Sequence, residues 1–204
     1  MVTKDDLNAL ETYQALMIEA KARAMSINTL VNDQRGIPSP LVREYGFLQI
    51  RMLCEIIALG CLVAHGDLVS RSPSQLKKAY SPGEIIAALD RLHSDFFPIP
   101  IHPEKTVTGW HMAEYNDSPY LAKTDIAKLW ARCGGILHRG DLKRVLKKQN
   151  PVQNSFSDLN DSGQKILNLL SKHRIIRLDR KLAFIAFLHD DAVGGEVRVL
   201  LGEA

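Results

Sequence analysis

The strongest constraint on the fold of this chain is its most apolar run, from Met52 to Ala64. We expect a helix over residues 41–65 that becomes apolar on every side after Arg51, a pattern typical of a helix surrounded by other elements. The run has thirteen residues and contains Glu55, whereas a membrane span needs about 20 apolar residues. The sequence therefore predicts a central core helix and not a membrane anchor.

Two charged residues, Arg51 and Glu55, lie one helical turn apart in this segment. A carboxylate in apolar surroundings needs a partner, because burying an unpaired charge is costly. We therefore predict a structural ion pair at the edge of the core. A catalytic role for Glu55 is the alternative.

Several further segments have helical periodicity. Apolar residues recur at intervals of three or four along residues 5–30, and Thr3 with Asp6 is typical of a helix cap. Ser81, Pro82 and Glu84 mark the start of another helix. The remaining predicted helices cover residues 124–137, 142–149 and 162–172, with Gly140 and Asp141 separating the first two of these.

Extended structure is expected mainly at the C-terminus. Residues 175–178, 182–188 and 196–201 are rich in strand-forming residues. Residues 96–119 contain four prolines, and we expect there a long ordered loop or a small hairpin. The sequence thus predicts a mainly α fold, with a helical domain over residues 1–150 and a small helix plus antiparallel β meander over residues 151–204.

Composition and cysteine usage describe an ordinary intracellular protein. The chain is 46% apolar and 24% charged, and residues 1–6 lack the features of a signal peptide. Cys54, Cys61 and Cys133 have no paired short spacing, so we expect buried free thiols. We predict a cytoplasmic protein without a membrane partner.

The sequence contains little that indicates a binding site for a metal, a nucleotide or another cofactor. His93, His102 and His111 lie nine residues apart, with Glu104 and Glu114 nearby, but metal sites usually contain more closely spaced pairs. The chain has no glycine-rich phosphate loop, dinucleotide fingerprint or nucleophile elbow. We therefore predict no metal and no cofactor.

Positive charge is concentrated in one stretch, from Lys123 to Lys148. It carries a net charge of +6 in a chain whose formal net charge is +3, so the rest of the chain is acidic. Such a distribution suits a phosphate backbone, although a solvated surface helix is the plain alternative. The candidate RNA-backbone contacts are Lys128, Arg139, Lys143 and Lys147.

The same stretch contains Arg132 and His138, with Gly134 and Gly135 between them. Two adjacent glycines in a helix cost about 1 kcal/mol each relative to alanine, so something is expected to approach the backbone there. A neighbouring helix, a nucleic acid strand or a dimer partner would each explain them. Without such a role, Arg132 is a surface cation and His138 a helix C-terminal histidine.

With an arginine and a histidine separated by five residues, the chain resembles the HEPN superfamily of small helical proteins from toxin–antitoxin and phage-defence systems. The resemblance covers residues 1–150 in architecture and the Arg132–His138 pair in motif. Cys133 stands where active members often carry a polar residue. The Phe97-Pro98-Ile99-Pro100 segment and its surroundings are also similar to uncharacterised bacterial proteins.

The resemblance implies metal-independent RNA cleavage by a dimer, with His138 as general acid or base and Arg132 stabilising the phosphate. An imidazole titrates near neutrality and a guanidinium binds phosphate oxygens in pairs, so both roles are chemically reasonable. Six residues of ideal helix place the two side chains about 120° apart. Either the glycine pair distorts the helix, or two chains assemble the site.

Three functions remain open from sequence. The first is a metal-independent endoribonuclease in a toxin or phage-defence context. The second is a non-catalytic module that binds nucleic acid or protein, such as an antitoxin, a sensor or a complex subunit. The third is a structural homodimer that buries an apolar face, such as that of the first helix, against a partner chain.

Overall fold

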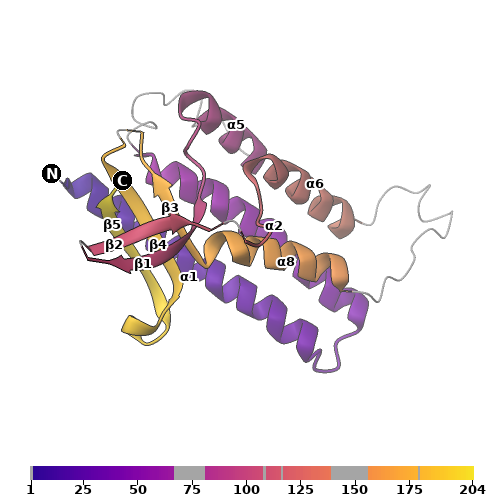
Figure 1. The fold of residues 1–204 in the computed structure, drawn as a ribbon. Coiled ribbons are helices and arrows are strands. Elements are labelled where there is room, and N and C mark those ends of the chain that lie inside the picture. The colour runs from indigo at the N-terminus through magenta and orange to yellow at the C-terminus, as the bar shows by residue number, and fades with distance from the viewer. Residues whose placement is uncertain (1, 67–80, 108, 116, 139–155, 179) are drawn as a thin grey trace.

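The structure is a computed structural model that describes residues 2–66, 81–107, 109–115, 117–138, 156–178 and 180–204. The fold is mixed α/β, mainly helical with a five-stranded antiparallel sheet (Figure 1). The helices are α1 (Lys4–Asn32), α2 (Ser39–Ala64), α5 (Pro82–Leu92), α6 (Ile126–Leu137) and α8 (Ser157–Leu170). The strands are β1 (Ile99–Thr106), β2 (Gly109–Glu114), β3 (Lys172–Ile176), β4 (Leu182–Asp190) and β5 (Glu196–Glu203). Short 3-10 helices are η1 (Lys123–Asp125) and η2 (Asp191–Val193).

Helices α1 and α2 form a long antiparallel hairpin (Figure 1). The predicted cap of α1 is confirmed, because Thr3 and Asp6 exchange side-chain and backbone hydrogen bonds in a capping box. The two helices approach closely at Gly60, where an added Cβ atom would lie 3.0 Å from the Tyr13 ring. A glycine at this position therefore lets the aromatic ring of α1 lie against the backbone of α2.

Helix α2 lies at the centre of the helical layer and packs against α1, α5, α6 and α8. The predicted core helix is thus observed, with most residues after Arg51 buried. Among the described residues, α2 is the one helix long and apolar enough to cross a membrane by length and composition. Core helices of soluble proteins pass the same test, so this property decides nothing about membranes, and the cytoplasmic location stays a prediction.

The sheet has the strand order β2-β1-β3-β4-β5, and every neighbouring pair is antiparallel. The proline-rich segment, predicted as a loop or small hairpin, is the β1–β2 hairpin, and it extends the three-stranded C-terminal meander. Strand β1 pairs with β3 only at Ile99 and Pro100. Pro103 lies beyond this pairing and faces β2 alone, so no donor to β3 is needed there and a proline is tolerated.

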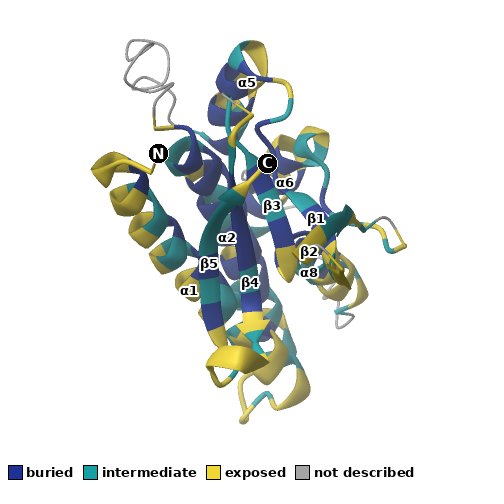
Figure 2. Cartoon of the chain, turned by 60° about the vertical axis from the view of Figure 1, so that its left-hand side comes forward, coloured by how far each residue is buried: buried dark blue, intermediate teal, exposed yellow. Residues whose placement is uncertain are grey.

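One face of the sheet carries the core, with α2 behind the sheet in Figure 2. Tyr13 of α1 contacts the Phe184 ring and hydrogen bonds to His173, so β3 and β4 pack directly on the first helix. Residues of α8 and of β3, β4 and β5 belong to the same hydrophobic cluster as those of α1 and α2. The C-terminal strands are thus built into the main core.

One helix begins earlier than the sequence predicts, and two other predictions cannot be compared with the structure. Helix α8 begins at Ser157, five residues before the predicted start at Ser162. Its first turn contains Asp158, whose carboxylate bonds to arginines on α2 and α6. The predicted helix 142–149 and the division at residue 150 lie outside the described residues.

Candidate functional site

Helix α6 positions the predicted site residues. It buries Ile126, Leu129 and Cys133 on one face, as the apolar spacing predicts, and this face packs on α2. The helix continues without interruption through Gly134 and Gly135 to its C-cap at His138. The glycine pair therefore does not break or distort the helix.

Gly134 is explained by packing inside the chain. An added Cβ atom at this position would lie 2.6 Å from Nη1 of Arg51. The Arg51 guanidinium carbon lies 3.7 Å from the centre of the Trp130 ring, close enough for a cation–π interaction. Gly134 thus leaves room for an arginine that stacks on the neighbouring tryptophan.

The predicted ion pair between Arg51 and Glu55 is confirmed, with 3.7 Å between Nε and Oε1. The indole nitrogen of Trp130 donates a hydrogen bond of 2.8 Å to the same carboxylate oxygen. Glu55 therefore links α2 to α6 as a structural group. Its contacts support the structural interpretation over a catalytic one.

Gly135, in contrast, is exposed, and an added Cβ atom would meet nothing within 4 Å. It lies on the same side of α6 as Lys128 and Arg132, at intervals of four and three residues. We call Lys128, Arg132 and Gly135 together the α6 face. This face combines two cations with an open stretch of helix backbone.

Arg132 contacts the start of α8. Its Nη2 atom donates a hydrogen bond of 2.7 Å to Oδ2 of Asp158, and its side chain is 48% exposed. Its other two nitrogens have no partner among the described residues. Arg43 of α2 bonds to the same oxygen at 2.5 Å. Both guanidinium groups lie near the Phe47 ring, at 4.7 Å for Arg43 and 5.7 Å for Arg132.

No family model, curated protein or solved structure matches this chain.

The structure gives Arg132 and His138 different surroundings. His138 is exposed at the end of α6, and within the described residues no hydrogen bond joins it to Arg132. Regular helix continues between them, so the distortion that would bring them together in one chain is not observed. Assembly by two chains remains the open alternative. Arg139, Lys143 and Lys147 lie outside the described residues.

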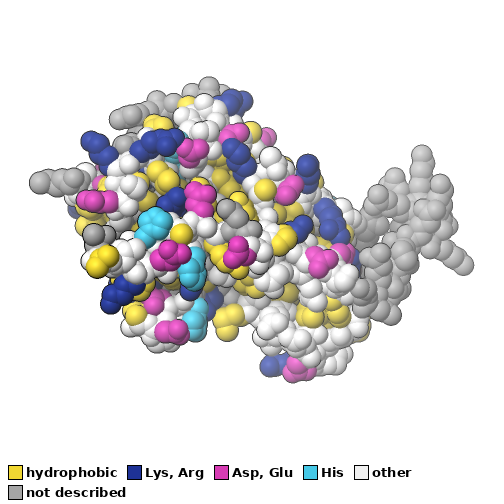
Figure 3. All heavy atoms as spheres, in the orientation of Figure 1, with side chains coloured by type: hydrophobic (Ala, Val, Ile, Leu, Met, Phe, Trp, Pro, Cys, Tyr) yellow, Lys and Arg dark blue, Asp and Glu magenta, His cyan; other side chains and the backbone are white. Residues whose placement is uncertain are grey.

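The described cations of the basic stretch are paired with acidic groups. Lys123 bonds to Asp90 at 2.6 Å, and Nζ of Lys128 lies 3.7 Å from Asp125. Basic and acidic side chains are likewise interspersed over the face in Figure 3. Attraction of a phosphate backbone to this part of the chain thus depends on the donors that these pairs leave unused, or on exchanging internal partners.

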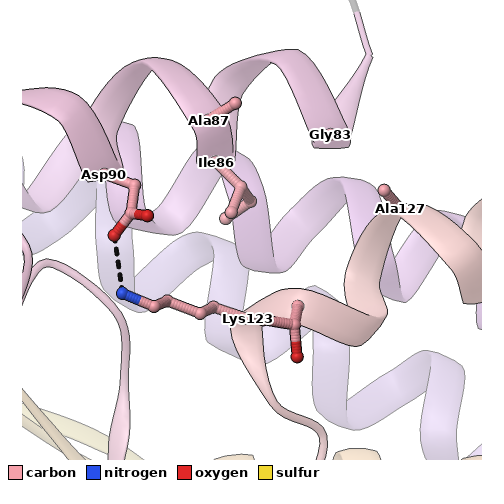
Figure 4. A pocket seen from close by; sticks show the side chains of 7 residues that line it. Gly83, Ile86, Ala87, Asp90, Lys123 and Ala127 are labelled. Atoms are coloured by element: carbon pink, nitrogen blue, oxygen red, sulfur yellow. Dashed lines mark hydrogen bonds and ion pairs between the residues drawn. The ribbon is translucent and has the colours of Figure 1, made fainter.

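A shallow pocket of about 230 Å³ lies between α5 and α6. Lys123 lines it and points toward Asp90 in Figure 4. The remaining lining is formed by small and apolar residues, Gly83, Ile86, Ala87 and Ala127, with Thr124. Since its one ion pair is already satisfied, the pocket has little with which to recognise a polar ligand.

The cysteines and histidines have mainly structural surroundings. All three thiols are free and buried, as predicted, and burial raises the pKa of Cys133 to about 11, so it is a neutral thiol. His93 is buried and lies 3.0 Å from the Ile176 carbonyl, while β pairing places His111 opposite Glu104. Where the chain is described, no group of three His, Cys, Asp or Glu side chains could hold a metal ion.

Sequence reasoning missed Arg43 and Asp158. They lie 115 residues apart, and neither is part of a recognisable motif. The available signal was weak: an acidic residue where a helix could begin, and an arginine four residues before an aromatic residue. Only the packing of α8 against α2 and α6 shows that both belong with Arg132.

Proposed function

We propose that this protein binds RNA through the α6 face, as a non-catalytic module. The observation that carries the proposal is that the Arg132 guanidinium is half exposed and uses one nitrogen for Asp158. An arginine with unused donors can hold phosphate oxygens in a bidentate manner. The resemblance to HEPN proteins is consistent with this role and stays a prediction.

The neighbours of Arg132 support the same interpretation. Lys128 is largely exposed one turn earlier, and its contact with Asp125 is a long surface ion pair of little strength. Among the described residues, Gly135 has no packing role that needs a glycine. An exposed glycine beside two cations allows a nucleic acid backbone to approach the helix closely.

Direct binding to labelled single-stranded RNA tests the proposal. Fluorescence anisotropy at 50 and 200 mM salt would compare wild type with Arg132→Ala and Lys128→Ala. We expect each variant to bind more weakly at 50 mM salt and to reduce the slope of log affinity against log salt by about 1. Lys165→Ala on α8, an exposed lysine elsewhere, is the matched control and should bind like wild type. Equal binding by all four proteins would contradict the proposal.

The alternative function is metal-independent RNA cleavage. It is favoured by the exposure of His138 at the end of the helix that carries Arg132. The test is cleavage of a mixed RNA pool in EDTA by wild type, His138→Ala and Arg132→Ala at equal folding. Loss of cleavage in both variants would support the enzyme, whereas intact RNA with wild type would favour binding alone.

A further inference from the structure

We propose that Arg43 and Arg132 form a phosphate-binding site, and that Asp158 occupies this site until a phosphate group displaces it. The inference rests on the proposed function for its biological ligand. Its chemistry, however, can be tested without RNA.

Oδ2 of Asp158 receives hydrogen bonds from two guanidinium groups that come from different helices, α2 and α6. Two guanidinium groups thus share one carboxylate oxygen. Guanidinium groups are suited to binding a planar carboxylate or a phosphate through paired donors. A phosphate, with its additional charged oxygens, can use donors of Arg132 that Asp158 leaves unused.

The arginines are held in place before any ligand arrives. Both guanidinium carbons lie within 6 Å of the Phe47 ring centre, and the Arg43 side chain is only 12% exposed. Like charges held this close to each other repel, so an anion is needed between them whenever the helices are packed. Asp158 supplies this anion in the structure.

Exchange of Asp158 for a ligand is geometrically simple. The residue lies in the first turn of α8, and its side chain is 28% exposed. Asp158 itself belongs to this turn, and the dipole of a helix favours an anion near its N-terminus. An incoming phosphate would then supply the anion between Arg43 and Arg132, whose guanidinium groups lie near the Phe47 ring.

The ligand class is therefore a phosphate group, either an internal phosphodiester or a terminal phosphate of RNA. In both cases Asp158 is an internal competitor that lowers the affinity of the free site. Neutralising this residue should strengthen binding, although it removes a contact that holds α8. A purely structural ion-pair cluster predicts no gain in binding.

The deciding experiment compares Asp158→Asn with Asp161→Asn. The second variant removes the same charge from the same helix, at an exposed position without an observed contact to the arginines. Anisotropy would use one RNA sequence with a 5′-phosphate or a 5′-hydroxyl, and calorimetry would use inorganic pyrophosphate. Circular dichroism at the assay temperature verifies that each variant is folded.

We expect Asp158→Asn to bind phosphate-bearing probes about tenfold more tightly than wild type, and Asp161→Asn to change affinity much less. Addition of Arg43→Gln to Asp158→Asn should remove the gain. If Asp158→Asn binds the 5′-phosphate and the 5′-hydroxyl RNA more tightly by the same factor, the site binds internal phosphodiesters. If the gain in affinity is larger for the 5′-phosphate RNA, the site binds a terminal phosphate.

The two proposals fail in different ways. Tighter pyrophosphate binding by Asp158→Asn without RNA binding would support the phosphate site and contradict the proposed function. RNA binding that depends on Arg132 but is unchanged or weakened in Asp158→Asn would overturn the site proposal alone. A gain of the same size in Asp161→Asn would also overturn it, because general electrostatics would then account for the effect.

Discussion

Replacing Tyr13 with phenylalanine tests how α1 is attached to the sheet. The Tyr13 hydroxyl lies 2.6 Å from Nε2 of His173, and both residues are buried. Nδ1 of His173 lies 2.9 Å from the Leu170 carbonyl and donates to it. Nε2 of the neutral ring must then accept the hydroxyl hydrogen. Tyr13→Phe keeps the ring contact with Phe184 and leaves a buried acceptor without a donor.

An unsatisfied buried polar group costs about 1–3 kcal/mol. We therefore expect the free energy of unfolding at pH 7 to fall by about this amount in Tyr13→Phe. Urea denaturation followed by circular dichroism measures it, provided that the slope of free energy against urea is unchanged. Tyr45→Phe is the matched control, because its hydroxyl donates to Ser26 in a partly buried position.

The control should change stability by less than about 0.5 kcal/mol, as is usual for substitutions near the surface. A loss in Tyr13→Phe no greater than that of the control would refute the reasoning. It would mean that water or a rearranged side chain satisfies His173, and that the hydrogen bond between α1 and β3 contributes nothing specific.

Two further predictions concern pH and the glycine pair. Burial lowers the pKa of His173 to about 4, so below the unfolded value of 6.5 the unfolded chain binds a proton that the folded protein excludes. Stability should therefore decrease as the pH falls from 6.5 to 4, by about 3 kcal/mol from this residue, and His173→Gln should show a smaller decrease in urea titrations. Gly134→Ala should destabilise the protein by about 1–3 kcal/mol because the new methyl group collides with Arg51. Gly135→Ala should be neutral or stabilising by up to about 1 kcal/mol, since its site is open and alanine favours helix. Thermal denaturation measures both glycine variants, and equal changes in stability for Gly134→Ala and Gly135→Ala would contradict this explanation.

The helices were predictable because their signals are local. Thr3 and Ser81 each begin a helix with the capping box that the sequence indicates. The mainly apolar run after Arg51 likewise predicted a core helix correctly. Such patterns depend on neighbours within a few residues, and the sequence contains them directly.

The complete sheet was not predictable in the same way. Prolines in residues 96–119 argue against strands, and the short pairing of Ile99 and Pro100 with β3 depends on residues more than 70 positions away. The candidate site has the same limit. Arg132 was singled out from a motif, whereas its contacts with Arg43 and Asp158 arise from three helices that meet only after folding.

The hydrogen bond between Tyr13 and His173 has a consequence for synthesis on the ribosome. The two residues are 160 positions apart, and at roughly 5–20 residues per second the ribosome needs about 8–30 s to make the intervening chain. During this time α1 is finished, but the strands β4 and β5 that pack on it are not yet made. The part of the Tyr13 ring that packs on Phe184 therefore lacks its partner for many seconds, even though α2 already covers another part of the ring, and a chaperone would have the most to protect in this period.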